Sequence, residues 1–297
     1  MFRRILNKTD RIQLLSILIL SFGPVGLSSA QVVDMDQTSW HSEGDNFTCR
    51  LRQPVNNGYL EFVARAGYPL SLTLFDGNKS STGTLSLLQT PPPWKHNQQS
   101  VELGKGPISP KSPYQPNGAE GLFQGLINGY WGKIVLDKKK EQKAITLSNT
   151  GIYKPASAFQ DCRNKLLPAS FDQLSLLRIQ FSSGKSRPQP KFADDLNNLA
   201  AYVREDKDIE AIYVDGYTDG AGHHLDNLQI AKDRAENVAR YLTYLGIPEE
   251  KIKTRFHAER YPVATNNTAA GRAKNRRVEV RLIRKNTPPD PKTFFSK

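Results

Sequence analysis

The last third of the chain alternates between segments with a strand-like and segments with a helix-like spacing of hydrophobic residues. Residues 174–181 and Ile212–Val214 are short apolar runs, and apolar residues stand at alternate positions in residues 278–282. Both patterns are typical of β-strands. We therefore expect three strands here, with a candidate for a fourth at Ile252–His257.

Between these strands, hydrophobic residues recur every three or four positions. One series runs from Phe192 to Val203, and a longer one runs from Leu228 to Leu245, where Gly246 follows as a helix stop. The order of elements is β-α-β-α-β. This order predicts helices packed on one face of a small mixed sheet over residues 172–285.

The preceding part, residues 31–171, has shorter hydrophobic segments separated by turn-forming residues. Strand-like segments occupy residues 59–64, 70–75, 83–88 and 144–147. No long amphipathic helix is evident among them. We predict a mainly β domain that ends near Phe171, which gives the whole chain an α+β fold.

The first thirty residues have the pattern of a secretory signal peptide. Four basic residues precede an apolar run from Leu14 to Leu20, which is too short to span a bilayer, and small residues up to Ala30 suit a cleavage site. The mature chain would then begin near Gln31, without a transmembrane segment and beyond the inner membrane. Residues 286–297, which contain three prolines, are expected to form a loose tail.

Location beyond the inner membrane bears on the cysteines and on the charge. Cys49 and Cys162 are the only two cysteines, and an oxidising compartment favours a disulfide between them. The net charge is +12, and +9 remains without the first thirty residues, which hold four basic residues and one acidic residue. Such a surface favours an anionic partner. Nucleic acid is excluded by the compartment and by the lack of a basic motif interleaved with aromatic residues.

The strongest candidate chemistry lies around the middle strand of the second part. Gly216–Gly222 is a glycine-rich turn directly after that strand, and it brings Thr218 and Asp219 to the edge of the sheet. Asn227 and Arg234 are seven residues apart and share one face of the following helix.

Arg276 precedes the last strand, in phase with Val278, so its side chain should point toward the packed side of the sheet. An aspartate and two arginines could hold a small zwitterion, because its carboxylate would meet arginine and its ammonium would meet Asp219. Alternatively, Asp219, Arg234 and Arg276 form salt bridges with one another and have no ligand.

Residues 174–283 resemble the OmpA-like family of peptidoglycan-binding domains. The resemblance rests on ordered motifs, which are Gly216-Tyr217-Thr218-Asp219, Asn227, Ile230, Arg234-Ala235, Pro262 and Gly271-Arg272-Ala273-Lys274-Asn275-Arg276-Arg277-Val278. It implies that Asp219 and Arg234 hold the diaminopimelate of the peptide stem, and that Thr218, Asn227, Arg276 and Arg277 line the pocket. The chain departs from the family at Tyr217, where histidine is usual, at Ala231, where serine is usual, and at Phe256-His257-Ala258.

The first part resembles a family of sodium-type flagellar motor proteins with the same plan of signal, β domain and wall-binding domain. The residues that carry this resemblance are Pro91-Pro92-Pro93-Trp94, Trp40 ahead of Cys49, Phe159-Gln160-Asp161-Cys162, Leu166 and Ser170-Phe171. The resemblance implies a periplasmic ring component that docks on the flagellar basal body and on a partner ring protein, and helps to recruit stator units. The alternative is an envelope protein that anchors another complex to peptidoglycan, without a motor role.

The sequence shows no arrangement typical of an enzyme. The five histidines lack further ligands at metal-binding spacing, and neither a Ser-His-Asp arrangement nor a Gly-x-Ser-x-Gly motif is found. We therefore expect no cofactor and no catalysis, with a wall hydrolase as the weaker alternative.

Overall fold

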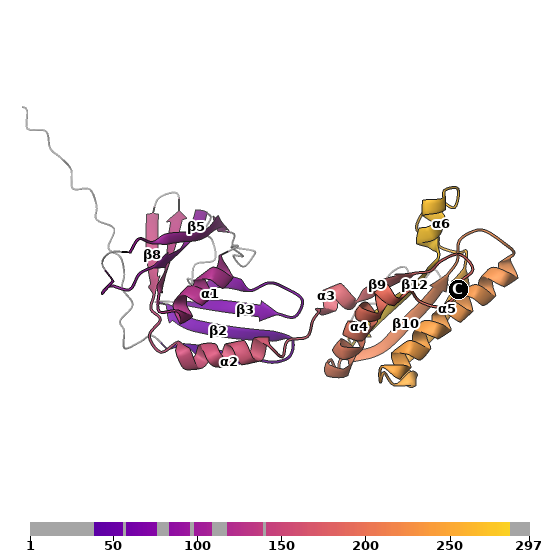
Figure 1. Cartoon of the computed structure of the whole chain (residues 1–297), viewed down its shortest axis with the longest axis horizontal. Coiled ribbons are helices and arrows are strands. Elements are labelled where there is room, and N and C mark those ends of the chain that lie inside the picture. Colours follow the sequence, from indigo (N-terminus) through magenta and orange to yellow (C-terminus); the bar gives the residue numbers. More distant parts are fainter. Residues whose placement is uncertain are drawn as a thin grey trace, which may run out of the picture.

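A computed structural model describes residues 39–55, 58–75, 83–95, 98–108, 118–138 and 141–285 (Figure 1). The predicted signal peptide and the predicted tail lie outside these residues. Within them, helices and sheets are mixed, so the α+β prediction is confirmed. No helix in the described ranges is long and apolar enough to cross a membrane.

The first part of the chain contains two four-stranded antiparallel sheets. The first sheet has the order β1-β2-β3-β4, and the second has the order β6-β5-β7-β8. Their bounds are β1 His41–Gly44, β2 Thr48–Val55, β3 Gly58–Arg65, β4 Ser71–Phe75, β5 Gly83–Thr90, β6 Val101–Ile108, β7 Trp131–Lys138 and β8 Glu141–Leu147.

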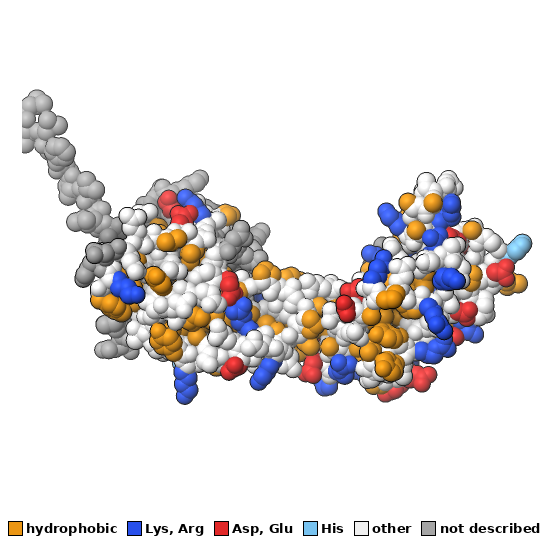
Figure 2. Space-filling view, in the orientation of Figure 1, with side chains coloured by type: hydrophobic (Ala, Val, Ile, Leu, Met, Phe, Trp, Pro, Cys, Tyr) orange, Lys and Arg blue, Asp and Glu red, His pale blue; other side chains and the backbone are white. Residues whose placement is uncertain are grey.

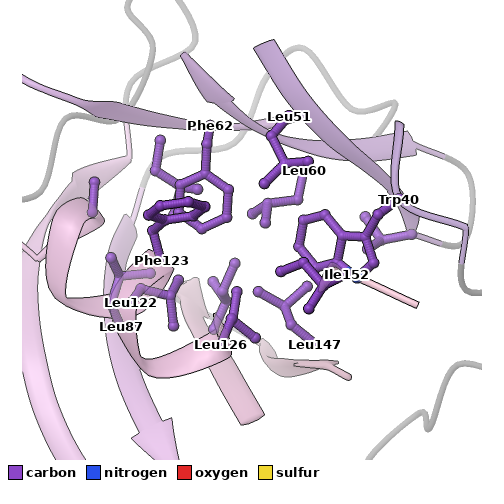
Figure 3. Packing of buried hydrophobic residues seen from close by; sticks show 14 of the residues in the cluster. Trp40, Leu51, Leu60, Phe62, Leu87, Leu122, Phe123, Leu126, Leu147 and Ile152 are labelled. Atoms are coloured by element: carbon purple, nitrogen blue, oxygen red, sulfur yellow. The ribbon is translucent and has the colours of Figure 1, made fainter. Parts of the chain in front are cut away.

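Alternation along these strands explains why the two sheets share a core. In β2, for example, Cys49, Leu51 and Val55 are buried, while Arg50 and Arg52 between them point outward. The core cluster joins strands of both sheets to helix α1, Ala119–Ile127 (Figure 3).

Two helices of this part, α1 and α2 (Tyr153–Arg163), do not follow from the hydrophobic pattern. Gly121 and Gly125 lower the helix propensity of α1, and only Ala156 and Phe159 of α2 are buried. Packing against the sheets supplies the stability that the low helix propensity of these segments does not provide. The ring of Phe123 in α1 lies 5.8 Å from Phe62 and 5.4 Å from Phe159, each edge to face.

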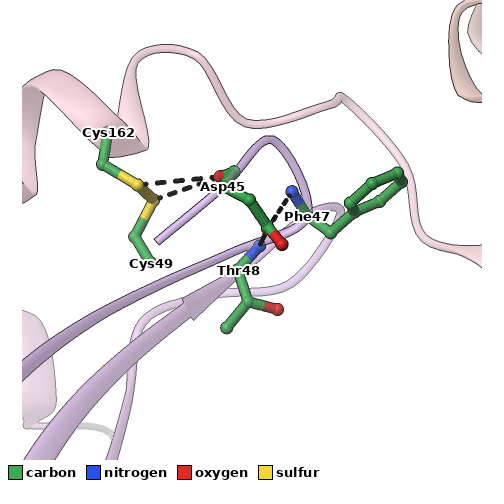
Figure 4. The surroundings of a disulfide bond; sticks show 5 residues. All are labelled: Asp45, Phe47, Thr48, Cys49 and Cys162. Carbon is green, nitrogen blue, oxygen red and sulfur yellow. Dashed lines mark hydrogen bonds between the residues drawn. A yellow bond between two sulfur atoms is a disulfide. The ribbon is translucent and has the colours of Figure 1, made fainter. Parts of the chain in front are cut away.

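The expected disulfide joins Cys49 of β2 to Cys162 of α2 (Figure 4). The two Cα atoms are 6.0 Å apart, and both sulfur atoms lie within 3.8 Å of the carbonyl oxygen of Asp45. The Asp45 carboxylate accepts hydrogen bonds from the backbone N–H groups of Phe47 and Thr48, at 2.8 Å each, and so fixes the turn before β2. The helix is thereby attached to the sheet that it covers.

The second part of the chain has one sheet with the order β11-β10-β12-β9. Strands β10 and β11 are parallel, and the other neighbours are antiparallel. The elements of this part are α3 Phe171–Leu174, β9 Leu176–Gln180, α4 Ala193–Glu205, β10 Ile209–Tyr217, α5 His224–Tyr244, β11 Ile252–Ala258, α6 Ala269–Asn275 and β12 Arg277–Arg284. The four predicted strands correspond to β9, β10, β11 and β12, and the two predicted helices correspond to α4 and α5. The short helices α3 and α6 were not predicted.

Helices α4 and α5 pack on one face of this sheet. Leu199 of α4 and Val238 of α5 are fully buried in a cluster with Val214 of β10 and Val280 of β12. This cluster begins at Leu174, whereas the first cluster ends at Phe159. The domain boundary near Phe171, which lies between them, stays a proposal.

The disulfide closes a sequence separation of 113 residues, so it restricts the unfolded chain strongly. We expect the double substitution Cys49→Ser and Cys162→Ser to lower the free energy of unfolding of the first part by about 4–5 kcal/mol. Denaturant unfolding followed by tryptophan fluorescence measures this change, because all three tryptophans precede Cys162. An unfolding midpoint for these tryptophans that is unaffected by the substitution or by a reductant would contradict the expectation.

Candidate functional site

The end of strand β10 brings the predicted site residues against helix α5. A Cβ atom on Gly216 would lie 2.1 Å from the carbonyl oxygen of Ala231, so only glycine permits this close approach of strand and helix. The next residues form a loop in which the Thr218 N–H donates to the Ala258 carbonyl at 2.8 Å. Gly222, at φ +92°, then turns the chain into α5.

Asp219 in this loop forms an ion pair with Arg276, which directly precedes β12. The Arg276 Nη1 lies 2.8 Å from the Asp219 Oδ2, and the two side chains are 16% and 11% exposed. Arg276 also donates through Nε to the Phe181 carbonyl at 3.2 Å, and Asp219 accepts a hydrogen bond from the Ala221 N–H at 3.3 Å. The pair is held in place from both sides and still reaches solvent.

Arg234 of α5 lies beneath this pair and is only 1% exposed. Its guanidinium donates to three backbone carbonyls, those of Lys185 at 2.9 Å, Tyr217 at 3.0 Å and Ser182 at 3.4 Å. Burial lowers the pKa of Arg234 to about 10, with nearby Arg276 acting in the same direction and Asp219 opposing it. Arg234 therefore stays protonated at neutral pH and ties the loop after β9 to the end of β10.

Thr218 directly precedes Asp219, and Asn227 lies two turns before Arg234 on α5. Both are buried, and the Thr218 Oγ1 has no hydrogen-bond partner among the described residues. Asn227 reaches Glu259, which also accepts from His224 at 2.7 Å if that nitrogen is protonated. Burial alone would raise the pKa of Glu259, but its hydrogen bonds with its own backbone N–H, with His224 and with Asn227 outweigh this effect and lower it.

Arg277, the last predicted site residue, is not brought to this group. Because side chains alternate along β12, it points to the opposite face of the sheet from Val278. There its guanidinium lies 3.8 Å from the ring centre of Tyr217 and donates to Glu279 at 2.9 Å and to the Tyr261 carbonyl at 3.1 Å. The structure thus brings together Thr218, Asp219, Arg234 and Arg276, whereas Asn227 bonds to Glu259 and Arg277 faces away.

Chemically, the gathered groups offer one carboxylate and two cations at the surface end of a sheet. Asp219 can accept from an ammonium group, and arginine can donate two parallel hydrogen bonds to a carboxylate. These are the kinds of group that recognise a zwitterion with an ammonium and a carboxylate on one carbon. Asp219 and Arg276 pair with each other, as the salt-bridge alternative expects, whereas Arg234 donates to carbonyls instead. Among the described residues, no cluster of three histidine, cysteine or acidic side chains suits a metal ion.

Asn275, in the motif before β12, has a structural role that the sequence analysis did not assign. It is fully buried at the end of α6, accepts from the N–H groups of Val263 and Ala264 near 3.0 Å, and donates to Asn266. It thereby fixes the loop before α6 and, with it, the position of Arg276. In the sequence, this structural role is indicated only by an uncharged asparagine within a short run of basic residues.

Asp215 of β10 is a second residue that the sequence analysis missed. It is fully buried on the face opposite the helices, where Arg255 donates twice to it at 2.6 and 2.9 Å, Arg281 donates at 2.8 Å, and His257 lies at 2.9 Å. Burial would raise its pKa, but these partners outweigh burial and hold the pKa well below its usual range. The sequence shows only that Asp215 stands two residues after Tyr213 on a strand, and therefore on the same face of the sheet.

Comparison with known proteins finds a match for each part of the chain. Residues 32–168 match the MotY N-terminal domain, and residues 180–276 match the OmpA family. The chain is 26% identical over 245 residues to the sodium-type flagellar protein MotY of Vibrio parahaemolyticus, covering 80% of this chain and 84% of that protein.

Further relatives match the second part alone. The probable lipoprotein YiaD of Escherichia coli is 36% identical over 104 residues, which is 35% of this chain and 47% of that protein. Among solved structures, the peptidoglycan-associated lipoprotein of Burkholderia pseudomallei is 26% identical, covers 36% of this chain and 89% of that one, and has a TM-score of 0.35. The C-terminal domain of Helicobacter pylori MotB is 20% identical, covers 37% and 86%, and has the same TM-score.

The buried Asp215 gives a prediction for stability. Because its folded-state pKa is depressed, it stabilises the fold above its unfolded pKa of about 3.9, and this contribution is lost as pH falls through the folded value. We expect Asp215→Asn to lower the free energy of unfolding by about 3–5 kcal/mol at pH 7, since it leaves Arg255 and Arg281 without their carboxylate.

Urea unfolding between pH 2 and pH 7 measures this effect, because the difference between the two chains should shrink toward the acid end. The exposed Asp208→Asn serves as a control with the same change of charge. Equal stabilities of Asp215→Asn and the unsubstituted chain at pH 7 would contradict the assignment.

Proposed function

Since this chain joins a MotY N-terminal domain to a domain of the OmpA family, we propose that it is a structural, non-enzymatic component of the flagellar motor in the periplasm. Its second domain binds peptidoglycan. Its first domain docks on the basal body and on a partner ring protein, and helps to recruit or stabilise stator units. The match of the first domain favours this proposal over an envelope anchor without a motor role, because only the second domain is shared with proteins such as YiaD.

The observation that carries wall binding is the Asp219–Arg276 ion pair above the buried Arg234. Diaminopimelate in the peptide stem ends in an ammonium group and a carboxylate on one carbon. The ammonium takes the place of Arg276 beside Asp219, and the carboxylate accepts from the arginines. The unpartnered Thr218 Oγ1 lies within the same group and supplies a further hydrogen bond.

Arg234 reaches such a ligand by exchanging acceptors. A carboxylate is a stronger acceptor for a guanidinium than a neutral carbonyl. The carbonyls of Ser182 and Lys185 belong to the loop after β9, and this loop would move when the ligand carboxylate replaces them. Arg234 therefore both holds the loops of the site in place and contributes to ligand binding.

The first domain offers an exposed aromatic side chain in the motif that carries its resemblance. Trp94, after three prolines, is 65% exposed, and its ring meets that of Trp131 edge to face at 6.2 Å. Exposed tryptophans of this kind are enriched where proteins meet partners. This side chain is our candidate contact to the basal body.

For the wall site, we expect Asp219→Asn to weaken sedimentation with purified peptidoglycan sacculi at least tenfold, because the ligand ammonium loses its carboxylate partner. The control Asp208→Asn should sediment like the unsubstituted chain. The supernatants also test the hydrolase alternative, since release of soluble wall fragments would contradict a non-enzymatic role. Undiminished sedimentation of Asp219→Asn would refute the site.

For the motor role, we expect the chain to co-purify with flagellar basal bodies and Trp94→Ala to reduce its yield there severalfold, while sacculus binding is unchanged. Tyr153→Ala, which removes a similarly exposed ring on α2, is the matched control. Asp219→Asn should still co-purify, because docking belongs to the first domain. Absence of all these chains from purified basal bodies would favour the anchor without a motor role.

A further inference from the structure

The sheet of the second domain has a face that α4 and α5 do not cover. Alternate residues of its four strands point there, on the side opposite the buried Val214 and Val280. The charged and aromatic residues at these positions are Arg178 of β9, Tyr213, Asp215 and Tyr217 of β10, Lys253, Arg255 and His257 of β11, and Arg277, Glu279 and Arg281 of β12. We call this set the open face.

Positive charge predominates on the open face. Five of its residues are lysine or arginine and two are acidic. Each of its carboxylates lies between two arginines: Asp215 pairs with Arg255 and Arg281, and Glu279 pairs with Arg277 at 2.9 Å and with Arg178 at 3.2 Å. The strand register places four of these residues side by side across the sheet, in the order Arg255, Asp215, Glu279 and Arg178.

The carboxylates hold these guanidinium groups in fixed positions. Arg255 also lies over the ring of Tyr213, 4.3 Å from its centre, and Arg277 lies over Tyr217. Pre-ordered arginines lose less conformational entropy when they bind an anion than flexible ones do. Arg178, with 57% of its side chain exposed, and the exposed Lys253 lie near opposite edges of the same face.

The open face and the site proposed for the peptide stem lie on opposite sides of the sheet and meet at one end of β10 and β12. Arg276, which pairs with Asp219, is followed directly by Arg277 on the open face. Likewise, Tyr217 of the open face immediately precedes Thr218 and Asp219 on β10. A polymer held at Asp219 would reach the open face by passing around this end of the sheet.

We propose that the open face is a second contact to peptidoglycan, which binds carboxylates of the wall polymer beside the stem held at Asp219. This inference rests on the proposed wall binding and extends it from one stem to the surrounding mesh. Peptide stems that are not cross-linked carry free carboxylates, and arginine binds carboxylate groups with two parallel hydrogen bonds. The exposed Arg178 and Lys253 and the partly exposed Arg255 and Arg281 present positive charge that matches such a polyanionic surface.

The test is sedimentation of the full-length chain with sacculi over a series of salt concentrations. We compare the double variant Arg178→Glu and Lys253→Glu, whose side chains are exposed, with Lys232→Glu and Arg240→Glu on helix α5, which change the net charge equally. The open-face variant should bind sacculi roughly three- to tenfold more weakly at low salt and depend less on salt. The α5 variant should bind like the unsubstituted chain.

A soluble stem peptide that contains diaminopimelate separates the two proposals. The open-face variant should bind this peptide with unchanged affinity, whereas Asp219→Asn should not bind it. If the open-face and α5 variants bind sacculi equally and with the same salt dependence, the open-face contact is refuted while the stem site stands. If the unsubstituted chain binds neither peptide nor sacculi, wall binding itself fails, and the open-face contact fails with it.

Circular dichroism and urea unfolding show whether the open-face variant is folded, since Arg178 shares Glu279 with Arg277. Because a misfolded variant would also bind poorly, the milder pair Arg178→Gln and Lys253→Gln is measured in parallel. It should weaken binding about half as much on a logarithmic scale. Binding of a folded Gln variant identical to that of the unsubstituted chain overturns the proposal.

Discussion

The second part of the chain depends on a buried guanidinium and on the carbonyl groups that accept its hydrogen bonds. A charge placed in the interior is tolerated only when hydrogen-bond acceptors surround it, and Arg234 takes them from Tyr217 on one side and from Ser182 and Lys185 on the other. This requirement sets the distance between the end of β10, the loop after β9 and helix α5. The loop that carries Asp219 inherits its position from the same contacts, because Asp219 lies only two residues after Tyr217.

Regular local patterns in the sequence predicted much of this domain. The spacing of apolar residues gave the longest helix, since His224–Tyr244 has one face buried over its whole length, and alternation gave β12. In the first domain the helices α1 and α2 escaped prediction, because their stability comes from ring contacts such as Phe62 with Phe123 and from the disulfide. Local propensity carries no information about such distant partners.

Some residues of the site were predicted from the sequence, and others were misplaced or missed. Motif spacing identified Asp219, Arg234 and Arg276, and the structure brings them together, while their binding of the wall stays a prediction. Arg277 was grouped with them because it is adjacent in sequence, yet neighbouring residues of a strand point to opposite faces. Asp215 was missed because no local pattern in the sequence indicates that Arg255 and Arg281, on two different strands, both contact it. A single sequence does not reveal residues whose role depends on partners that are distant in the chain.

The disulfide has a consequence for mechanical load. Cys162 lies near the end of α2, and only eight residues separate it from Phe171, where the wall-binding domain begins in our proposal. If the second part is held at the wall, as we propose, tension on it enters the first part at this point. The covalent bond passes that tension directly to Cys49 in the inner strand β2, which is hydrogen-bonded to β1 and β3 on its two sides. Helix α2 is therefore not the only attachment between the linking segment and the first part of the chain, because the load also reaches the hydrogen-bonded strands of the sheet.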